Sequence, residues 1–242
     1  MNAINIYVII LQKYLGGIIV TTNINRVLFD YDGTLIIHDA ENEGRRVVNM
    51  LGAGEEQINE FEKRLSIFFA HYFSVTNRKM TYELYLANLE KVINPMELFG
   101  VSVVALDEAM KENCKQTTTL ANNAKETLEY LVGKGYQLCV LTNGFYSDQV
   151  DDMKRKGIFE YFEKVYAWDN FYTKPDRRAF IRALAGTEPV HNVMIGDSLR
   201  ADIEPAKKMG IYTVGINMPN LAEVYMSPDT VITDLSEIKT IL

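Results

Sequence analysis

The fold of this chain is decided by residues 26–34, which read RVLFDYDGT. The first four form a short, largely apolar run that ends at a Gly turn, and this predicts a buried β-strand. Side chains two residues apart on an extended chain project to the same side, so Asp30 and Asp32 converge on one point. Two carboxylates this close repel each other unless a cation or a shared proton compensates them. The stretch therefore predicts a site for a hard divalent ion such as Mg2+, which takes oxygen ligands.

The turn after the strand adds two useful groups. Gly33 allows the backbone to come close to a ligand, and Thr34 offers a hydroxyl to an anionic oxygen. Asp-Gly is also an ordinary turn dipeptide, so this segment alone is equally consistent with a surface turn. The choice between a site and a plain turn depends on the rest of the chain.

Composition restricts the class of protein. The chain has 242 residues, of which 48% are hydrophobic and 24% charged, as in soluble globular proteins. Its net charge of −7 argues against nucleic acid as the main partner, but it leaves open a small phosphorylated ligand. The two cysteines, Cys114 and Cys139, provide no disulfide framework, and Cys139 lies in an apolar run typical of a buried thiol. We therefore expect a cytoplasmic protein.

Residues 1–25 form an N-terminal extension of uncertain role. Residues 4–20 are largely apolar, but Gln12, Lys13 and the pair Gly16-Gly17 interrupt them. A membrane helix usually needs about 20 mostly apolar residues, and a secretory signal needs a basic region before its apolar run. We expect a peripheral helix or strand that packs on the domain, and membrane association stays the alternative.

The remainder divides into a helical stretch and an alternating one. Residues 39–119 have helical periodicity, with apolar side chains at Ile58, Phe61, Leu65 and Phe68. After them, strands predicted at 137–141, 164–167, 193–195, 211–214 and 231–232 alternate with helices predicted at 122–134, 148–156, from Pro175 through 184, and 201–209. This alternation is typical of an α/β fold, a Rossmann-like parallel sheet with helices on both faces. We expect residues 26–38 and 120–242 to form this core and residues 39–119 an all-helical cap.

Ligands of open α/β sheets bind at the carboxyl ends of the strands. Three predicted strands are followed by polar clusters, at residues 30–34, 142–144 and 196–198. Lys174, beside Pro175, lies at the start of a further predicted helix. Together they supply a nucleophile, hydroxyl and amide donors, a cation and further acids. Phosphoryl transfer requires such a set, because it depends on positioning and on charge stabilisation.

These clusters resemble a known family. FDYDGTL at 29–35, LTNG at 141–144, KPD at 174–176 and IGDS at 195–198, followed by Asp202, look like the four ordered motifs of the haloacid dehalogenase-like (HAD) hydrolases. Four motifs in order at predicted strand ends are a specific pattern. The resemblance runs from about residue 26 to the C-terminus and leaves out residues 1–25.

The resemblance implies a role for each motif residue. Asp30 is the expected nucleophile, which forms an aspartyl-phosphate, and Asp32 the expected general acid and base. Lys174 would neutralise charge on the nucleophile and the phosphoryl group. Thr142, Asn143 and the nearby amides would hold phosphate oxygens. The expected metal ligands and supporting residues are Asp30, Asp197 and the carbonyl of Asp32 for Mg2+, with Gly33, Thr34, Ser198 and Asp202 in support.

Within the family, an acid at position 32 favours phosphate esters. Dehalogenating members lack this acid because halide leaves without protonation, whereas an alcohol needs the proton. We therefore predict a Mg2+-dependent phosphomonoesterase for a nucleoside monophosphate, phosphoglycolate or a sugar phosphate. A 2-haloacid dehalogenase, a phosphomutase and a non-catalytic binding protein are the alternatives. The cap would exclude water and read the substrate, and its polar-tipped candidates are His71, Tyr72, Arg78, Lys79, Tyr82 and Tyr85.

Overall fold

A computed structural model describes residues 10–15, 18–39, 43–72, 79, 81–168, 171–218 and 226–242. Its strands are β1 (Ile10–Leu15), β2 (Ile18–Asn23), β3 (Arg26–Phe29), β4 (Ile36–Ile37), β5 (Thr119–Leu120), β6 (Gln137–Leu141), β7 (Lys164–Tyr166), β8 (Asn192–Gly196), β9 (Tyr212–Ile216) and β10 (Thr230–Ile232). Its α-helices are α1 (Glu43–Met50), α2 (Ile58–Tyr72), α3 (Tyr82–Ile93), α4 (Pro95–Phe99), α5 (Val103–Thr117), α6 (Ala124–Gly133), α7 (Tyr146–Arg155), α8 (Arg177–Leu184), α9 (Glu204–Lys208) and α10 (Ile238–Ile241).

The main sheet of the described chain has six parallel strands in the order β10-β9-β8-β3-β6-β7. The strand that carries the DYDGT motif, β3, pairs with β6 on one side and β8 on the other, with Phe29 opposite Val140 and Ile195. Because β3 lies between β6 and β8 and all three strands are parallel, their carboxyl ends lie side by side. The polar residues that follow β3, β6 and β8 therefore meet at this end of the sheet. The expected α/β fold is confirmed.

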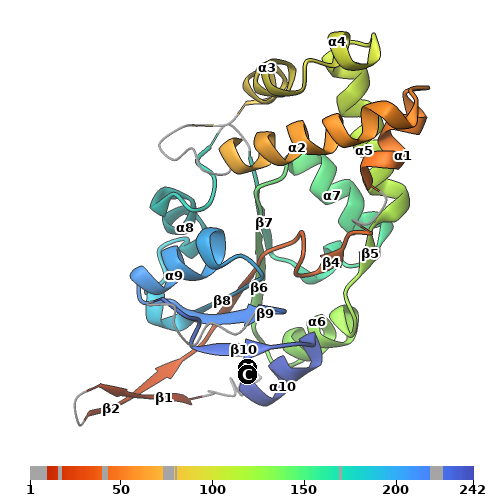
Figure 1. Ribbon diagram of the computed structural model, residues 1–242. Helices are drawn as coiled ribbons and strands as arrows, with labels where there is room; N and C mark the ends of the chain where they lie inside the picture. Colours follow the sequence, from red (N-terminus) through yellow and green to blue (C-terminus); the bar gives the residue numbers. More distant parts are fainter. Residues whose placement is uncertain are drawn as a thin grey trace.

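The two faces of the sheet carry separate apolar layers. Val27 and Phe29 join a cluster with residues of α6, α7 and α10, whereas Leu28 joins one with residues of α8 and α9. Successive side chains of a strand point to opposite faces, so a strand covered on both sides must be apolar throughout. All four residues of β3 are buried, and the one charged residue, Arg26, donates from its guanidinium to the carbonyls of Ala183 and Leu184. In Figure 1, α8 and α9 lie on one side of the sheet and α6 and α10 on the other.

Helices α1 to α5 form a helical region between β4 and β5, as expected for residues 39–119. It has its own apolar cluster, which includes Phe61, Phe68 and Leu89 and also takes in Trp168 from the chain after β7. The strands β4 and β5 pair antiparallel, Ile36 with Leu120 and Ile37 with Thr119. The two connections to the helical region thus run side by side (Figure 1). The domain boundaries themselves stay a prediction.

One local expectation was wrong. We expected Pro175 to open a helix, but α8 begins at Arg177 and its N-cap is Asp176, whose carboxylate accepts from the backbone N–H of Arg178. A capping carboxylate satisfies a free N–H, which Pro cannot do. The helix expected around 201–209 is found, and its first part, Leu199–Ile203, is a π-helix that precedes α9.

Part of the N-terminal extension is a β-hairpin. Strands β1 and β2 pair antiparallel from Ile10 with Asn23 to Leu15 with Ile18. These residues are therefore strands, while the expected packing on the domain stays a prediction, and the part of the extension before Ile10 lies outside the described residues. In Figure 1 the hairpin extends away from the sheet at the end opposite the helical region. No helix in the described ranges combines the length and apolar character needed to cross a membrane.

Candidate active site

Asp30 lies at the carboxyl end of β3, between the ends of β6 and β8. The carboxyl ends of these parallel strands are called the sheet edge below. Its backbone N–H donates to the carbonyl of Ile195 on β8 at 2.9 Å, which continues the strand ladder up to the acidic residue. Its Oδ1 accepts a hydrogen bond of 2.8 Å from the N–H of Tyr31. Only 7% of the residue is exposed. The strand thus fixes the position of the predicted nucleophile.

Lys174 is a buried cation between two acids. Its Nζ lies 2.6 Å from Oδ1 of Asp30 and 2.5 Å from Oδ1 of Asp202, and the residue is 2% exposed. Burial alone would lower the pKa of Lys174, but the charges of Asp202 and Asp30 outweigh it and raise the pKa above its ordinary value. Lys174 is therefore a permanent positive charge beside Asp30.

Asn143 holds the backbone that carries Lys174. Its Nδ2 donates to the carbonyl of Lys174 at 3.0 Å, and its Oδ1 accepts from the N–H of Lys174 at 2.8 Å. Both ends of the amide are used in this contact. We predicted phosphate binding for Asn143, and that role stays a prediction; the side chain is committed to the loop after β7.

Asp197 and Asp202 complete an acidic group around Asp30. One carboxylate oxygen from each of the three residues lies within 4.8 Å of the other two. Burial, followed by the charge of Asp30, raises the pKa of Asp197 to about 6. The same two causes raise the pKa of the fully buried Asp202, against the opposing charge of Lys174. Three acids and one lysine leave negative charge uncompensated at this point.

Two glycines permit the close approach of these acids. A Cβ on Gly33, whose φ is +81°, would lie 2.3 Å from Oδ2 of Asp197. A Cβ on Gly196 would lie 2.4 Å from Oδ2 of Asp202. Any side chain at either position would displace a carboxylate, so the motif needs glycine there.

The π-helix after β8 places Asp202. Its N-cap is Ser198, whose Oγ accepts from the N–H of Ala201 at 3.1 Å, while the N–H of Ser198 donates to Oδ2 of Asp202 at 3.0 Å. The N–H of Ile203 donates to the carbonyl of Ser198 at 3.2 Å, which is the i to i+5 hydrogen bond of a π-turn. Asp202, five residues after Asp197, is thereby turned back toward the sheet and Lys174. Ser198 supports the site through these backbone contacts.

Asp32 lies apart from the lysine, and two polar side chains hold its carboxylate. Oδ1 is 3.0 Å from Nε2 of His38, and Oδ2 accepts from Nε2 of Gln149 at 3.1 Å. The Asp32 side chain is 44% exposed, so its acid group is accessible to a ligand. The hydrogen bond to Asp32, followed by one to Cys114, raises the pKa of His38 to about 10.

Sequence reasoning did not identify His38 and Gln149. Gln149 lies in the first turns of α7, and Gly144 makes room for it, because a Cβ on Gly144 would lie 2.0 Å from its Nε2. His38 follows β4 in the connection to the helical region. Neither position belongs to a motif, and only the six-residue separation of His38 from Asp32 could have suggested a contact.

The two predicted hydroxyls are buried. Oγ1 of Thr142 accepts from the N–H of Gly144 at 3.2 Å, and the residue is 3% exposed. Thr34 is 0% exposed, and its Oγ1 has no hydrogen-bond partner among the described residues. Phosphate contacts by these residues stay predictions. For the cap candidates, Arg78 and the side chains of His71 and Tyr72 lie outside the described residues.

The acidic group is suited to a hard divalent cation. It offers only carboxylate oxygens, lies within a 4.8 Å span and has a net negative charge even beside Lys174. Mg2+ binds through one or two carboxylates and keeps several waters, so the set of donors fits this ion.

Comparison with known proteins agrees with this geometry. Residues 24–210 match the family model described as haloacid dehalogenase-like hydrolase. The chain is 33% identical over 129 residues to a glyceraldehyde 3-phosphate phosphatase of Methanothermobacter thermautotrophicus, an alignment that covers 50% of the chain and 57% of the relative. It is 26% identical over 209 residues to a pyrimidine 5'-nucleotidase of Streptococcus pneumoniae, with 81% of the chain and 84% of the relative covered.

A solved structure shares the fold. The magnesium-bound HAD hydrolase of Bacillus subtilis superimposes with a TM-score of 0.70 at 20% identity, covering 90% of this chain and 98% of that one. The chain spans little more than half the length of the Methanothermobacter relative. The family model, in contrast, includes β3, β6, β8 and the whole helical region. The chain therefore belongs to the haloacid dehalogenase-like hydrolases.

Proposed function

We propose that the protein is a Mg2+-dependent phosphomonoesterase that hydrolyses a small phosphate ester through an aspartyl-phosphate on Asp30. The observation that carries this proposal is the ion pair of 2.6 Å between Asp30 and the buried Lys174, next to two further acids. A carboxylate with a fixed cation beside it can act as a nucleophile toward phosphorus without needing a base.

In the first step, the carboxylate of Asp30 attacks phosphorus and the bond to the ester oxygen breaks. Lys174 and the N–H of Tyr31 both bind Oδ1, so the carboxylate is oriented before substrate arrives. The lysine also offsets negative charge that the phosphoryl group brings close to Asp30. Asn143 keeps Lys174 in register through its two backbone hydrogen bonds.

Asp32 acts as the general acid and then as the general base. It donates a proton to the leaving alkoxide in the first step, and in the second it accepts a proton from the water that attacks the aspartyl-phosphate. Hydrolysis then releases inorganic phosphate and regenerates Asp30. Gln149 and His38 hold the two oxygens of Asp32 and so orient it for both transfers.

The residues that would hold Mg2+ are Asp30, Asp197 and, by family resemblance, the backbone carbonyl of Asp32. When bound, the ion offsets the charge of the acids and polarises the phosphoryl oxygens. Asp202 is an alternative ligand from the same group, but its contact with Lys174 favours a role in holding the lysine.

The relatives act on different phosphate esters, so the substrate is proposed as a class: nucleoside monophosphates, phosphoglycolate or sugar phosphates. The LTNGF segment at 141–145 resembles that of nucleotidase-like members of the family, which makes a nucleoside monophosphate the first candidate. Aromatic side chains gather at the border with the helical region, where Phe145 lies 5.3 Å from Tyr85 and 5.1 Å from Trp168, centroid to centroid. These rings pack edge to face against one another, so this cluster supports closure of the cap more than stacking of a base.

Phosphate release from a panel of nucleoside monophosphates, sugar phosphates and phosphoglycolate tests the proposal, with Mg2+ and with excess chelator. We expect release that requires the metal, and the ranking of substrates identifies what the cap recognises. The matched control is Asp151→Asn on the exposed surface of α7, which we expect to leave release unchanged. Metal-independent release, or none from folded, metal-loaded protein, would contradict the proposal. Halide release from a haloacid would favour a dehalogenase, and phosphate transfer between sugar positions a mutase.

A further inference from the structure

A second group of metal-binding side chains lies at the base of the helical region. His38 follows β4, Glu43 is the first residue of α1, and Cys114 lies on α5. One ligand atom from each lies within 4.8 Å of the other two, and all three residues are half-buried. The Sγ of Cys114 is 4.0 Å from Oε1 of Glu43. Three separate segments therefore bring nitrogen, oxygen and sulfur donors to one point.

His38 is already oriented as a metal-binding histidine would be. Its Nε2 lies 3.0 Å from Oδ1 of Asp32, which leaves Nδ1 for another partner. Histidines that bind metals usually donate their second ring N–H to a carboxylate, which fixes the tautomer and the ring orientation. The Asp32 carboxylate supplies this support from the other side of the ring.

The donor set distinguishes this group from the acidic group around Asp30. Imidazole and thiolate are ligands for Zn2+ and similar ions, whereas Mg2+ takes oxygen almost alone. Three protein ligands leave a fourth position of a tetrahedral zinc ion for water. All three residues are partly exposed, so solvent reaches this part of the structure.

We propose that His38, Glu43 and Cys114 form a Zn2+-binding site that joins Asp32 to helices α1 and α5. Binding displaces the protons of the Cys114 thiol and of the His38 ring nitrogen that takes the metal. Because the site includes the connection after β4, a bound ion ties this connection to the helical region. A bound ion also immobilises His38 and, through its contact, Asp32, which has to serve first the leaving oxygen and then the attacking water. We therefore expect occupancy to slow turnover, an effect that rests on the proposed phosphatase function.

Cobalt substitution tests binding without any use of activity. Co2+ is added to the full chain in the presence of excess Mg2+, which keeps the acidic group around Asp30 occupied. We expect a thiolate-to-cobalt charge-transfer absorption in wild-type protein that Zn2+ abolishes by competition. Cys114→Ser should lose the absorption, and Cys139→Ala, the control for the other thiol, should keep it. No such absorption, or an equal one in Cys114→Ser, would overturn the proposal.

The affinity for Zn2+, measured by competition with a chromophoric chelator, tests Glu43 as a ligand in addition to Cys114. We expect Cys114→Ser and Glu43→Gln each to weaken Zn2+ binding by at least about 10-fold. Far-ultraviolet circular dichroism shows that each variant is folded. Equal affinities in folded wild-type and variant proteins would contradict the site.

Inhibition separates this site from the proposed function. With Mg2+ in excess, we expect Zn2+ to inhibit phosphate release, and Cys114→Ser to need at least about 10-fold more Zn2+ for the same effect. Equal inhibition of both proteins would overturn the coupling to Asp32. If no protein releases phosphate, the proposed function fails, while the cobalt and zinc titrations still decide whether the site exists.

Discussion

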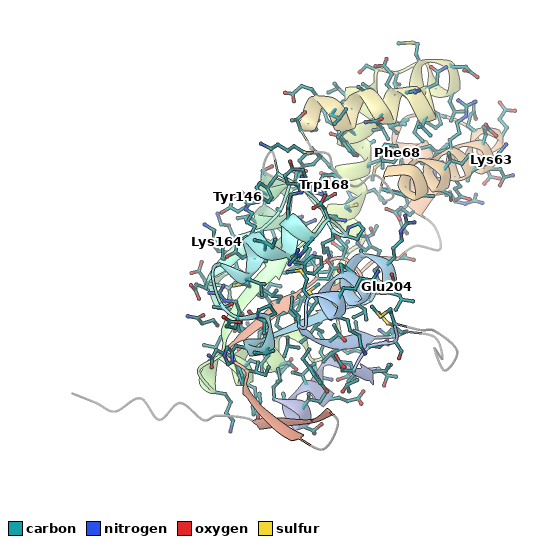
Figure 2. All side chains as sticks on the ribbon, turned by 90° about the vertical axis from the view of Figure 1, so that its left-hand side faces the viewer. Lys63, Phe68, Tyr146, Lys164, Trp168 and Glu204 are labelled. Carbon is teal, nitrogen blue, oxygen red and sulfur yellow. The ribbon has the colours of Figure 1, made fainter. Side chains whose placement is uncertain are left out.

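The sheet edge and the helical region are built by opposite means. The sheet edge buries charge: Lys174 and Asp202 are 2% and 0% exposed and lie in direct contact. The helical region buries rings, with Phe61 and Phe68 at 0% and 1% exposure and Trp168 packed against them. Figure 2 shows Trp168 below the helical region and Phe68 within it. The contrast indicates that the first region is arranged for chemistry and the second for packing.

The energetic costs of the two regions differ accordingly. A buried ion pair contributes little net stability, because removing both charges from water costs as much as their attraction returns. Breaking one partner is expensive, since the other charge remains buried alone. Burying a large aromatic side chain, in contrast, is favourable by itself, by about 2–3 kcal/mol. Substitutions should therefore have different consequences in the two regions.

The largest effect is expected from Asp30→Asn at the sheet edge. The amide is close in shape to the carboxylate but is a poor nucleophile, so we expect turnover to fall by at least about 10^4-fold. Steady-state phosphate release with the best substrate of the panel measures this loss. A decrease below about 10-fold in folded protein would contradict the role of Asp30.

Lys174→Met removes the cation and leaves Asp30 and Asp202 buried together. We expect a loss of about 3–5 kcal/mol in the free energy of unfolding, together with a loss of activity. Urea denaturation measures the stability. The control is Lys208→Met, which removes an exposed pair with Glu204 and should cost no more than about 0.5 kcal/mol. Equal stability of the two variants would contradict the burial of Lys174 between Asp30 and Asp202.

Phe68→Leu tests the packing of the helical region. The smaller side chain should cost about 1–2 kcal/mol, because the rings around it cannot fully close the gap. Trp168 is the single tryptophan of the chain and packs in the same cluster, so its fluorescence reports unfolding there. Ile67→Ala is the control, since Ile67 is 51% exposed and should change stability by less than about 0.5 kcal/mol.

The last comparison, which leaves both activity and stability unchanged, concerns the two cysteines, one in the sheet and one in the helical region. Burial raises the pKa of the Cys139 thiol on β6 from 9.0 to about 11, which lowers its thiolate fraction about 100-fold at neutral pH. Cys114 on α5 is half-buried. We expect iodoacetamide to alkylate Cys114 first in native protein, and Cys139 only after unfolding. Mass spectrometry of timed digests follows both thiols, and simultaneous labelling would mean that the core opens with the helical region.

The same contrast explains what could be predicted from sequence. The strands that carry the motifs were predicted closely, with β3 at the expected residues 26–29, because short apolar runs followed by glycine specify both strand and turn. The meeting of Asp30 and Asp197 followed from one rule on parallel sheets, whereas the family resemblance added Lys174 and Asp202 to the same site. The positions of motif residues at strand ends are thus enough to predict that they lie close together.

Contacts between regions could not be predicted in this way. His38 and Gln149 reach Asp32 through the packing of the β4 connection and α7, which no local pattern encodes. The π-helix at 199–203 depends on hydrogen bonds between Ser198 and Asp202 rather than on helix propensity. Asp176, and not Pro175, sets the start of α8 for a similar reason, because its side chain caps the helix by accepting from the backbone N–H of Arg178.

The most direct test of the account is to trap the phosphoenzyme. Wild-type protein is mixed with radiolabelled substrate and Mg2+, quenched in acid during the first turnover, digested and analysed by mass spectrometry. The account predicts an acid-stable, base-labile phosphoryl group on Asp30, which is absent in Asp30→Asn and when chelator is present. Label on another residue, or turnover without any labelled protein, would contradict it.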